Sequence, residues 1–235
     1  MRTDDVNFKM RSSDRDVSFH EAERTRVGAG TASSFGRVND DGSSQSGNER
    51  NHFFLNRGCG AEFLDVSGIS GLDNIADGRS FALWDFDQDG WQDIALANAN
   101  TPLLSIYRNR IGELAGAEDI RSAALRFIGG NHQARANSRW SNRDGYGLSF
   151  ELDVGERTLL RERRCGEGLA AQNSSTMVIG LGEHDGASEL RVRWPSGVEQ
   201  TLGSVRAGTL VTVYENPDDS PTGEPRTTQP YGKFP

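Results

Sequence analysis

The stretch "ALWDFDQDGWQDIALAN" (82–98) places four aspartates within nine residues, between two short apolar runs. The flanking runs have the length and composition of strands, so the stretch predicts a hairpin with an acidic loop at its turn. Two like charges about 4 Å apart repel by roughly 1 kcal/mol in water, and by more where a fold excludes solvent. The loop therefore needs a partner that neutralises Asp85, Asp87, Asp89 and Asp93.

The ligand chemistry of this loop favours calcium. Its pattern is D-x-D-x-D-G-x-x-D, in which alternate carboxylates converge on one point when the chain turns tightly, and Gly90 permits that turn. A dense set of oxygen ligands suits Ca²⁺ better than Mg²⁺, which keeps a rigid, hydrated octahedron. We expect a Ca²⁺ site with four carboxylates and one backbone carbonyl as ligands, from Asp85, Asp87, Asp89, Asp93 and Trp91.

The loop differs from an EF-hand in two respects. An EF-hand has a bidentate glutamate at the twelfth loop position and a helix on each side, whereas Leu96 stands at that position here and both flanks are strand-like. A metal ligated wholly by such loop oxygens is usually structural rather than catalytic. The alternative is a solvated acidic hairpin that holds no metal.

The rest of the chain predicts a mostly β protein with polar ends. Short apolar runs are broken by Gly, Asn and Asp about every ten residues, which is typical of all-β folds. Residues 1–50 and 216–235 are polar and rich in Gly, Ser, Asn or Pro, so we expect extended arms there, and 112–123 is a linker with helical character. Predicted strands lie at 52–56, 61–66, 79–85, 93–98, 103–109, 124–129, 147–154, 157–164, 176–182, 189–195, 198–202 and 209–215.

Charge and composition exclude several classes of protein. A net charge of -8 disfavours a general nucleic-acid binder. No apolar run reaches the roughly 18 residues needed to span a bilayer, and the first sixteen residues lack the apolar core of a secretory signal. Two cysteines, Cys59 and Cys165, permit either one disulfide or two free thiols.

We find no recognised catalytic motif, so we expect a protein that is not an enzyme. The four histidines are scattered, without H-E-x-x-H or zinc spacing, and neither G-x-S-x-G nor a phosphate-binding glycine loop is present. Carboxylates on different strands could still meet in space and act as a general acid and base.

Several stretches resemble known families. The aspartate loop resembles the calcium loop of an FG-GAP or VCBS repeat, the unit of integrin-type propellers, and "NHFFLNRGCGAEFLDVSGISGL" (51–72) resembles the segment that precedes it there. Three later segments resemble the ASPIC/UnbV domain, which is found at the end of cartilage acidic protein and of many bacterial homologues. These segments are "SNRDGYGLSFEL" (141–152), "LAAQNSSTMVIGLG" (169–182) and "ELRVRWPSGVEQTLGSVRAGTLVTVYE" (189–215).

The resemblance implies one propeller-blade-like calcium unit at 51–111, followed after the linker by an ASPIC/UnbV-like β-sandwich at 124–215. Trp194 precedes a turn in an alternating strand, where a large aromatic is more often core than a binding platform. One blade cannot close a propeller, so the second domain, an arm or other subunits must cover its sheet edges. Kinship also implies an extracellular, cell-surface or periplasmic location.

Three functional hypotheses follow. The first is a calcium-stabilised, non-catalytic β scaffold or binding module that works through protein–protein contacts, self-association included. The second is a dedicated subunit of a larger filament or membrane-associated complex, whose arms wrap neighbouring subunits. The third is a carbohydrate-active hydrolase or a glycan binder that uses calcium to shape its site.

Overall fold

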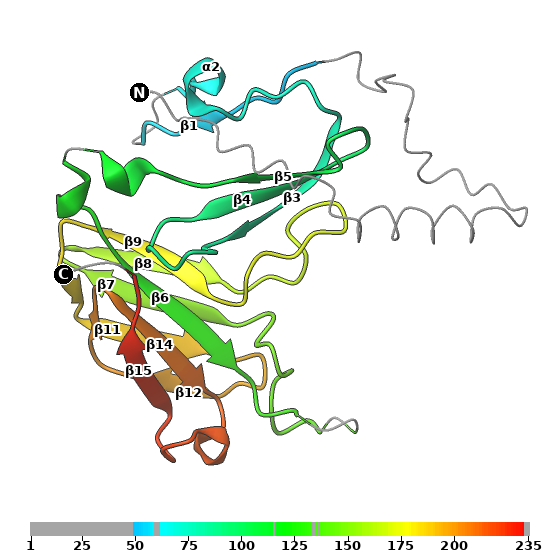
Figure 1. Cartoon of the computed structure of the whole chain (residues 1–235). Coiled ribbons are helices and arrows are strands. Elements are labelled where there is room, and N and C mark those ends of the chain that lie inside the picture. The colour runs from blue at the N-terminus through cyan, green and yellow to red at the C-terminus, as the bar shows by residue number, and fades with distance from the viewer. Residues whose placement is uncertain (1–48, 59–61, 115, 133–134, 136, 233–235) are drawn as a thin grey trace, which may run out of the picture. The chain divides into compact units, whose positions relative to one another are not determined.

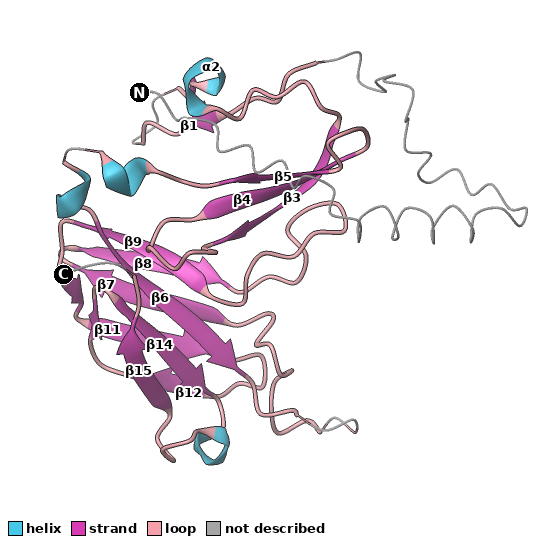
Figure 2. Ribbon diagram, in the orientation of Figure 1, coloured by secondary structure: helices cyan, strands magenta, loops and turns pink. Residues whose placement is uncertain are grey.

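The computed structural model describes residues 49–58, 62–114, 116–132, 135 and 137–232. It is mostly β with several antiparallel sheets, which confirms the predicted fold class (Figures 1 and 2). Nearly all of the predicted N-terminal arm lies outside the described residues, as does Cys59, while Cys165 is an exposed free thiol. None of the helices in the described part of the chain has the length and apolar character that crossing a membrane requires.

Two four-stranded sheets form a β-sandwich. The first sheet has the strand order β12 (Glu199–Thr201), β11 (Glu189–Arg193), β7 (Ser149–Val154), β8 (Arg157–Glu162). The second has the order β15 (Arg226–Pro230), β14 (Thr209–Tyr214), β6 (Arg121–Ile128), β9 (Met177–Gly182). Strands β6 and β14 pair in parallel, while the other neighbours are antiparallel. A small antiparallel pair, β10 (Gly186–Ala187) with β13 (Val205–Arg206), accompanies them.

The core lies between these two sheets because their strands alternate. On β7, Phe150, Leu152 and Val154 are buried while the residues between them are partly exposed. They join buried side chains of β6, β9, β11 and β14 in one hydrophobic cluster. Trp194 belongs to this cluster with 1% of its surface exposed, and its Nε1 donates to Gln200 Oε1 at 2.8 Å. Its predicted place in the core is confirmed.

The N-terminal half of the described chain contains shorter elements. Strands β1 (Phe54–Leu55) and β2 (Leu64–Asp65) form an antiparallel pair, followed by the one-turn helix α2 (Ser67–Ser70). A three-stranded sheet then has the order β3 (Gly78–Trp84), β4 (Asp93–Asn98), β5 (Leu104–Tyr107). Strand β4 has the predicted bounds. Its hairpin with β3 carries the aspartate loop, as the sequence predicts.

The predicted helical linker differs from the observed structure. Residues Ile111–Glu113 and Ala117–Asp119 form two 3₁₀ turns, η1 and η2, and β6 already begins at Arg121. Gly116 has a φ of 88°, a left-handed conformation that no helix continues through. The alanines that follow are buried in the sheet, so tertiary packing overrides their helical propensity.

The C-terminal segment also differs from the predicted arm. After the 3₁₀ turn η3 (Pro217–Asp219), strand β15 pairs antiparallel with β14 along the edge of the second sheet. A proline at its last position is tolerated because an edge strand leaves one side of its backbone unpaired. Tyr231, directly after β15, packs against Ala124 and Leu210. The chain's own sheet therefore holds this segment.

The chain divides into two compact units. One contains the described residues up to Phe81 together with Ala95–Tyr107, and the other contains Ala82–Ile94 together with the described residues from Arg108 onward. The aspartate loop is therefore grouped with the β-sandwich, whereas the sequence predicts one continuous unit at 51–111. Long-range contacts of the loop, described below, account for this division.

Candidate metal centre

The aspartate loop connects the end of β3 at Trp84 to the start of β4 at Asp93. Two residues with positive φ, Gln88 at 54° and Gly90 at 90°, turn the chain sharply. The Asp85 carboxylate accepts backbone hydrogen bonds from Asp89 N at 3.0 Å and Gly90 N at 2.9 Å, so the chain curls around its first carboxylate. The close spacing of Asp and Gly therefore generates the loop locally.

This turn brings three of the predicted ligands together. One carboxylate oxygen from each of Asp85, Asp87 and Asp89 lies within 4.8 Å of the other two, and all three residues are half-buried. Among the described residues this is the group that could hold a metal ion. The donor set consists of hard, anionic oxygens, which fits Ca²⁺.

Asp93 lies outside that group, and its carboxylate is hydrogen-bonded to backbone N–H groups. It is 1% exposed, and its two oxygens accept hydrogen bonds from Phe86 N at 3.0 Å and Asn109 N at 2.7 Å. Burial raises the pKa of Asp93, although the two backbone donors oppose that shift. In this arrangement Asp93 ties the loop to the segment after β5, and its role as a ligand remains a prediction.

Trp91 closes the loop by packing. Its backbone N donates to Asp89 Oδ1 at 3.0 Å, and its indole ring lies against Gly112, where any Cβ would collide with the ring. The role of its carbonyl as a calcium ligand remains a prediction.

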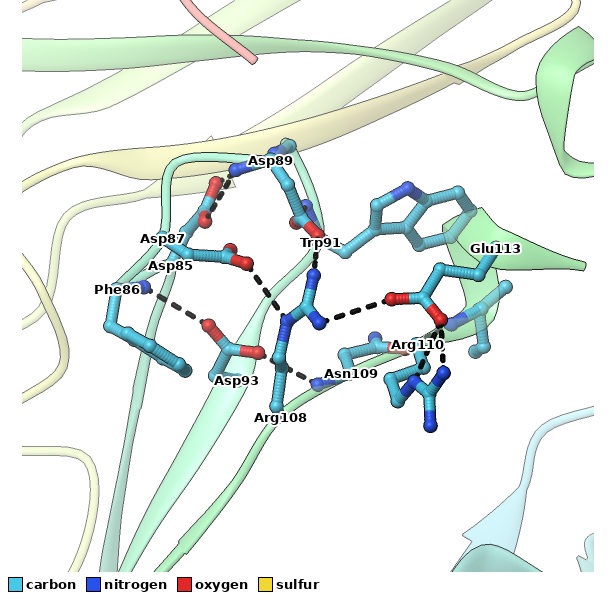
Figure 3. A network of polar contacts seen from close by, with 12 residues as sticks. Asp85, Phe86, Asp87, Asp89, Trp91, Asp93, Arg108, Asn109, Arg110 and Glu113 are labelled. Atoms are coloured by element: carbon cyan, nitrogen blue, oxygen red, sulfur yellow. Dashed lines mark hydrogen bonds and ion pairs between the residues drawn. The ribbon is translucent and has the colours of Figure 1, made fainter. Parts of the chain in front are cut away.

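An ion-pair network that sequence reasoning missed adjoins the carboxylates (Figure 3). Arg108 Nε donates to Asp87 Oδ2 at 2.8 Å, and its Nη2 lies 3.6 Å from Asp89 Oδ2. The Nη1 of the same guanidinium lies 3.0 Å from Glu113 Oε1, and Glu113 also accepts from Arg110 Nε at 2.7 Å. Burial works against the charge of Arg108, but the hydrogen bond and charge of Asp87 and the charge of Glu113 raise its pKa.

Contacts with the sandwich fix the loop from other sides. Ser122 Oγ of β6 donates to Gly90 O at 3.2 Å. The hydroxyl of Tyr231 is hydrogen-bonded to Asp85, and burial together with this bond raises the pKa of Tyr231. Asn173 Oδ1 accepts from Leu83 N at 2.8 Å. These residues are far from the loop in sequence, so no local pattern could have pointed to them.

A cavity of about 180 Å³ lies beside the end of β8, with Leu83, Gln92 and the basic run 161–164 in its wall. Arg163 is only 4% exposed, lies over the Tyr146 ring at 5.1 Å and donates to Ser174 O at 2.8 Å. Arg163 is therefore part of the packing, whereas Arg161 and Arg164 on either side of it are exposed.

The W-P-S-G turn at 194–197 contains a further polar cluster within the sandwich. Ser196 Oγ donates to Glu215, a carboxylate that is 2% exposed and also accepts bonds from Ser141 and Gly130. Apart from Gly130, the residues of this cluster, the turn and Trp194 lie in a part of the chain that matches a known family. Residues 138–220 match the model of the ASPIC and UnbV family.

The ASPIC/UnbV match covers the chain from before β7 to the end of η3, which is most of the sandwich. It confirms this part of the predicted resemblance. The likeness of the aspartate loop to an FG-GAP or VCBS repeat remains a prediction. No curated protein matches the chain.

Proposed function

We propose that the protein is a calcium-stabilised, non-catalytic β scaffold or binding module that acts through protein–protein contacts. The convergence of the Asp85, Asp87 and Asp89 carboxylates at one hairpin turn carries this proposal. These three residues would hold the Ca²⁺ ion, and Asp93 and the Trp91 carbonyl are the further ligands we expect from the loop. The ion would supply positive charge that relieves the repulsion among the aspartates.

A structural role for the ion fits the surroundings of the loop. Asp85 is bonded to Tyr231 and Gly90 to Ser122, so an ordered loop also orders its contacts with β6 and the end of β15. An ion bound by the folded chain and not by the unfolded chain stabilises the fold by mass action. The same argument requires no chemistry at the metal.

Exposed apolar side chains support a role in protein contacts. Large apolar patches are rare on the surface of a soluble monomer, and where they occur they often mark a site of protein–protein contact. In the described residues that precede the β-sandwich, several aromatic and aliphatic side chains are 39% to 65% exposed, among them Phe53, Phe54, Leu55, Phe63, Leu64, Ile69, Ile75, Phe81, Trp84 and Phe86. They also favour the second candidate, a subunit of a larger filament or membrane-associated complex. We propose an extracellular, cell-surface or periplasmic location from kinship alone.

The proposal is tested on the full chain with calcium and with EDTA. We expect native mass spectrometry to show one calcium ion per chain and a change in association when the chelator removes it. Thermal unfolding should shift upward in calcium, since a ligand at 100 times its Kd adds about 2.7 kcal/mol of stability. An Asp87→Asn variant should lose most of this shift. Identical masses and identical melting with both reagents would contradict the proposal.

A further inference from the structure

We propose that Arg108 is an internal counter-cation that sets the affinity of the aspartate loop for its divalent ion. This inference rests on the proposed calcium function and adds a regulating residue to the same site. In the protein without the ion, the guanidinium neutralises part of the charge of the loop. Arg108 therefore opposes the binding of a second, divalent positive charge.

The contacts of Arg108 place its charge at the carboxylates and not merely near them. The guanidinium is bonded to Asp87 at 2.8 Å and lies 3.6 Å from Asp89, two of the three residues whose oxygens converge. The Arg108, Asp87 and Asp89 side chains are 28%, 21% and 11% exposed. Solvent and salt screen such partly buried pairs much less than they screen pairs on an open surface.

Glu113 gives the guanidinium a second partner. It lies 3.0 Å from Arg108 Nη1, on the side of the guanidinium away from the aspartates, as Figure 3 shows. Arg108 can thus give up its bonds to Asp87 and Asp89 when an ion takes their oxygens, and keep its bond to Glu113. Because Arg108 contacts both the aspartates and Glu113, it can release the aspartates without losing every partner for its charge.

Two opposite effects on calcium binding follow from this arrangement. Removing the charge of Arg108 leaves the carboxylates without their internal partner, so the ion-free protein loses stability and calcium binds more tightly. Removing the charge of Glu113 leaves Asp87 and Asp89 as the carboxylates that pair with Arg108. Arg108 then competes more strongly with calcium for them, so calcium binds more weakly. Unit charges a few ångströms apart near a protein surface interact strongly enough to change a binding constant about tenfold.

The test titrates calcium chloride into the full chain by calorimetry and records unfolding in EDTA. Arg108→Gln should bind calcium about tenfold more tightly than the natural protein and melt at a lower temperature in EDTA. Arg108→Lys retains the charge and should stay within about threefold of the natural affinity. The matched control is Arg193→Gln, which removes an exposed arginine paired with Glu199 at 2.9 Å and should leave the affinity unchanged.

A double-mutant cycle of Arg108 and Glu113 measures the coupling between these two residues and gives a second test of the inference. Glu113→Gln should weaken calcium binding about threefold or more, and this loss should disappear when Arg108→Gln is also present. Equal or weaker binding by Arg108→Gln, in a natural protein that does bind calcium, would overturn the inference and leave the proposed function standing. Calcium binding in neither protein would overturn both, whereas binding only by Arg108→Gln would support the inference about Arg108 and overturn the proposed function of the natural protein.

Discussion

Glu215 is a carboxylate buried within the β-sandwich. It is 2% exposed, and its oxygens accept hydrogen bonds from Ser141 N at 2.7 Å, Ser141 Oγ at 2.7 Å and Gly130 N at 2.9 Å, as well as from Ser196 Oγ. Buried carboxylates are tolerated only where donors of this kind surround them. Glu215 thus fastens the loop after β6 to the W-P-S-G turn.

Replacing Glu215 with glutamine should therefore destabilise the protein strongly. The new amide would turn an NH₂ group toward backbone donors, which leaves buried donors without an acceptor, and we expect a loss of about 2–4 kcal/mol. Urea unfolding at neutral pH measures this loss. Glu156→Gln, in the exposed turn between β7 and β8, should change stability by less than about 0.5 kcal/mol. Equal effects of the two changes would contradict the role of Glu215.

At the residue scale, sequence reasoning succeeds where the geometry is local. Asp85, Asp87 and Asp89 come together because their spacing and Gly90 shape one tight turn. Arg108 could have been suspected, since it lies near the end of the predicted strand 103–109, the next strand after the aspartate hairpin. Asn109 and Tyr231 could not, because their contacts depend on how separate strands pack.

At the scale of the strands, β7 and β11 are joined by a charged cluster on the solvent face. Arg191 lies directly opposite Glu151, and its guanidinium pairs with Glu151 at 2.9 Å and with Asp153 at 2.6 Å, as well as with Glu189. The hydrogen bonds from Arg191 and Thr158 lower the pKa of Asp153 from 3.8 to about 2. Cross-strand pairs of opposite charge favour this register.

The lowered pKa predicts a specific acid sensitivity. Asp153 contributes stability above its unfolded pKa of about 3.8, and this contribution is lost as the pH falls toward the folded value of about 2. Asp153→Asn should be less stable than the natural protein at pH 7. Its melting temperature should also fall less steeply between pH 4 and pH 2. Parallel melting curves for the two proteins over that pH range would refute this explanation.

Strands with alternating apolar residues are predictable from the sequence, while segments stabilised by packing are not. Strand β7 shows its buried positions plainly, and β4 has its predicted bounds. Strand β15 has no such alternation. It forms because β14 offers it an unpaired edge and because Tyr231 anchors its end, neither of which the sequence displays.

At the scale of the whole molecule, the buried core is concentrated in the C-terminal half. Every buried member of the main hydrophobic cluster lies between Ala123 and Val213. Among the described residues before β6, the buried hydrophobic side chains are Ala76 and Ala117. Buried apolar surface is the main source of stability, so the β-sandwich should hold most of it.

A fragment of residues 108–235 should therefore fold without the rest of the chain. We expect a cooperative thermal transition and near-ultraviolet circular dichroism from the packed Trp194, because the fragment retains both four-stranded sheets. Leu190→Ala in the same fragment should cost about 2–5 kcal/mol, since Leu190 is completely buried. A fragment that melts without cooperativity would show that the core needs the N-terminal elements.

At this scale the sequence predicts the β-sandwich but not the division of the chain. Alternation and the W-P-S-G turn indicate the sandwich, and the family match supports it for residues 138–220. The grouping of Ala82–Ile94 with the sandwich depends on contacts such as Ser122 with Gly90, which join residues far apart in the chain.

The parallel pairing of β6 with β14 has a consequence for biosynthesis. Strand β6 is the first strand of the sandwich to be translated, yet its neighbour Val211, opposite Leu125, is made only after the strands β7 to β13. Contacts between residues so distant in sequence form slowly. During translation, the edge of β6 that pairs with β14 therefore stays uncovered until β14 leaves the ribosome, and in this interval the nascent chain is open to aggregation.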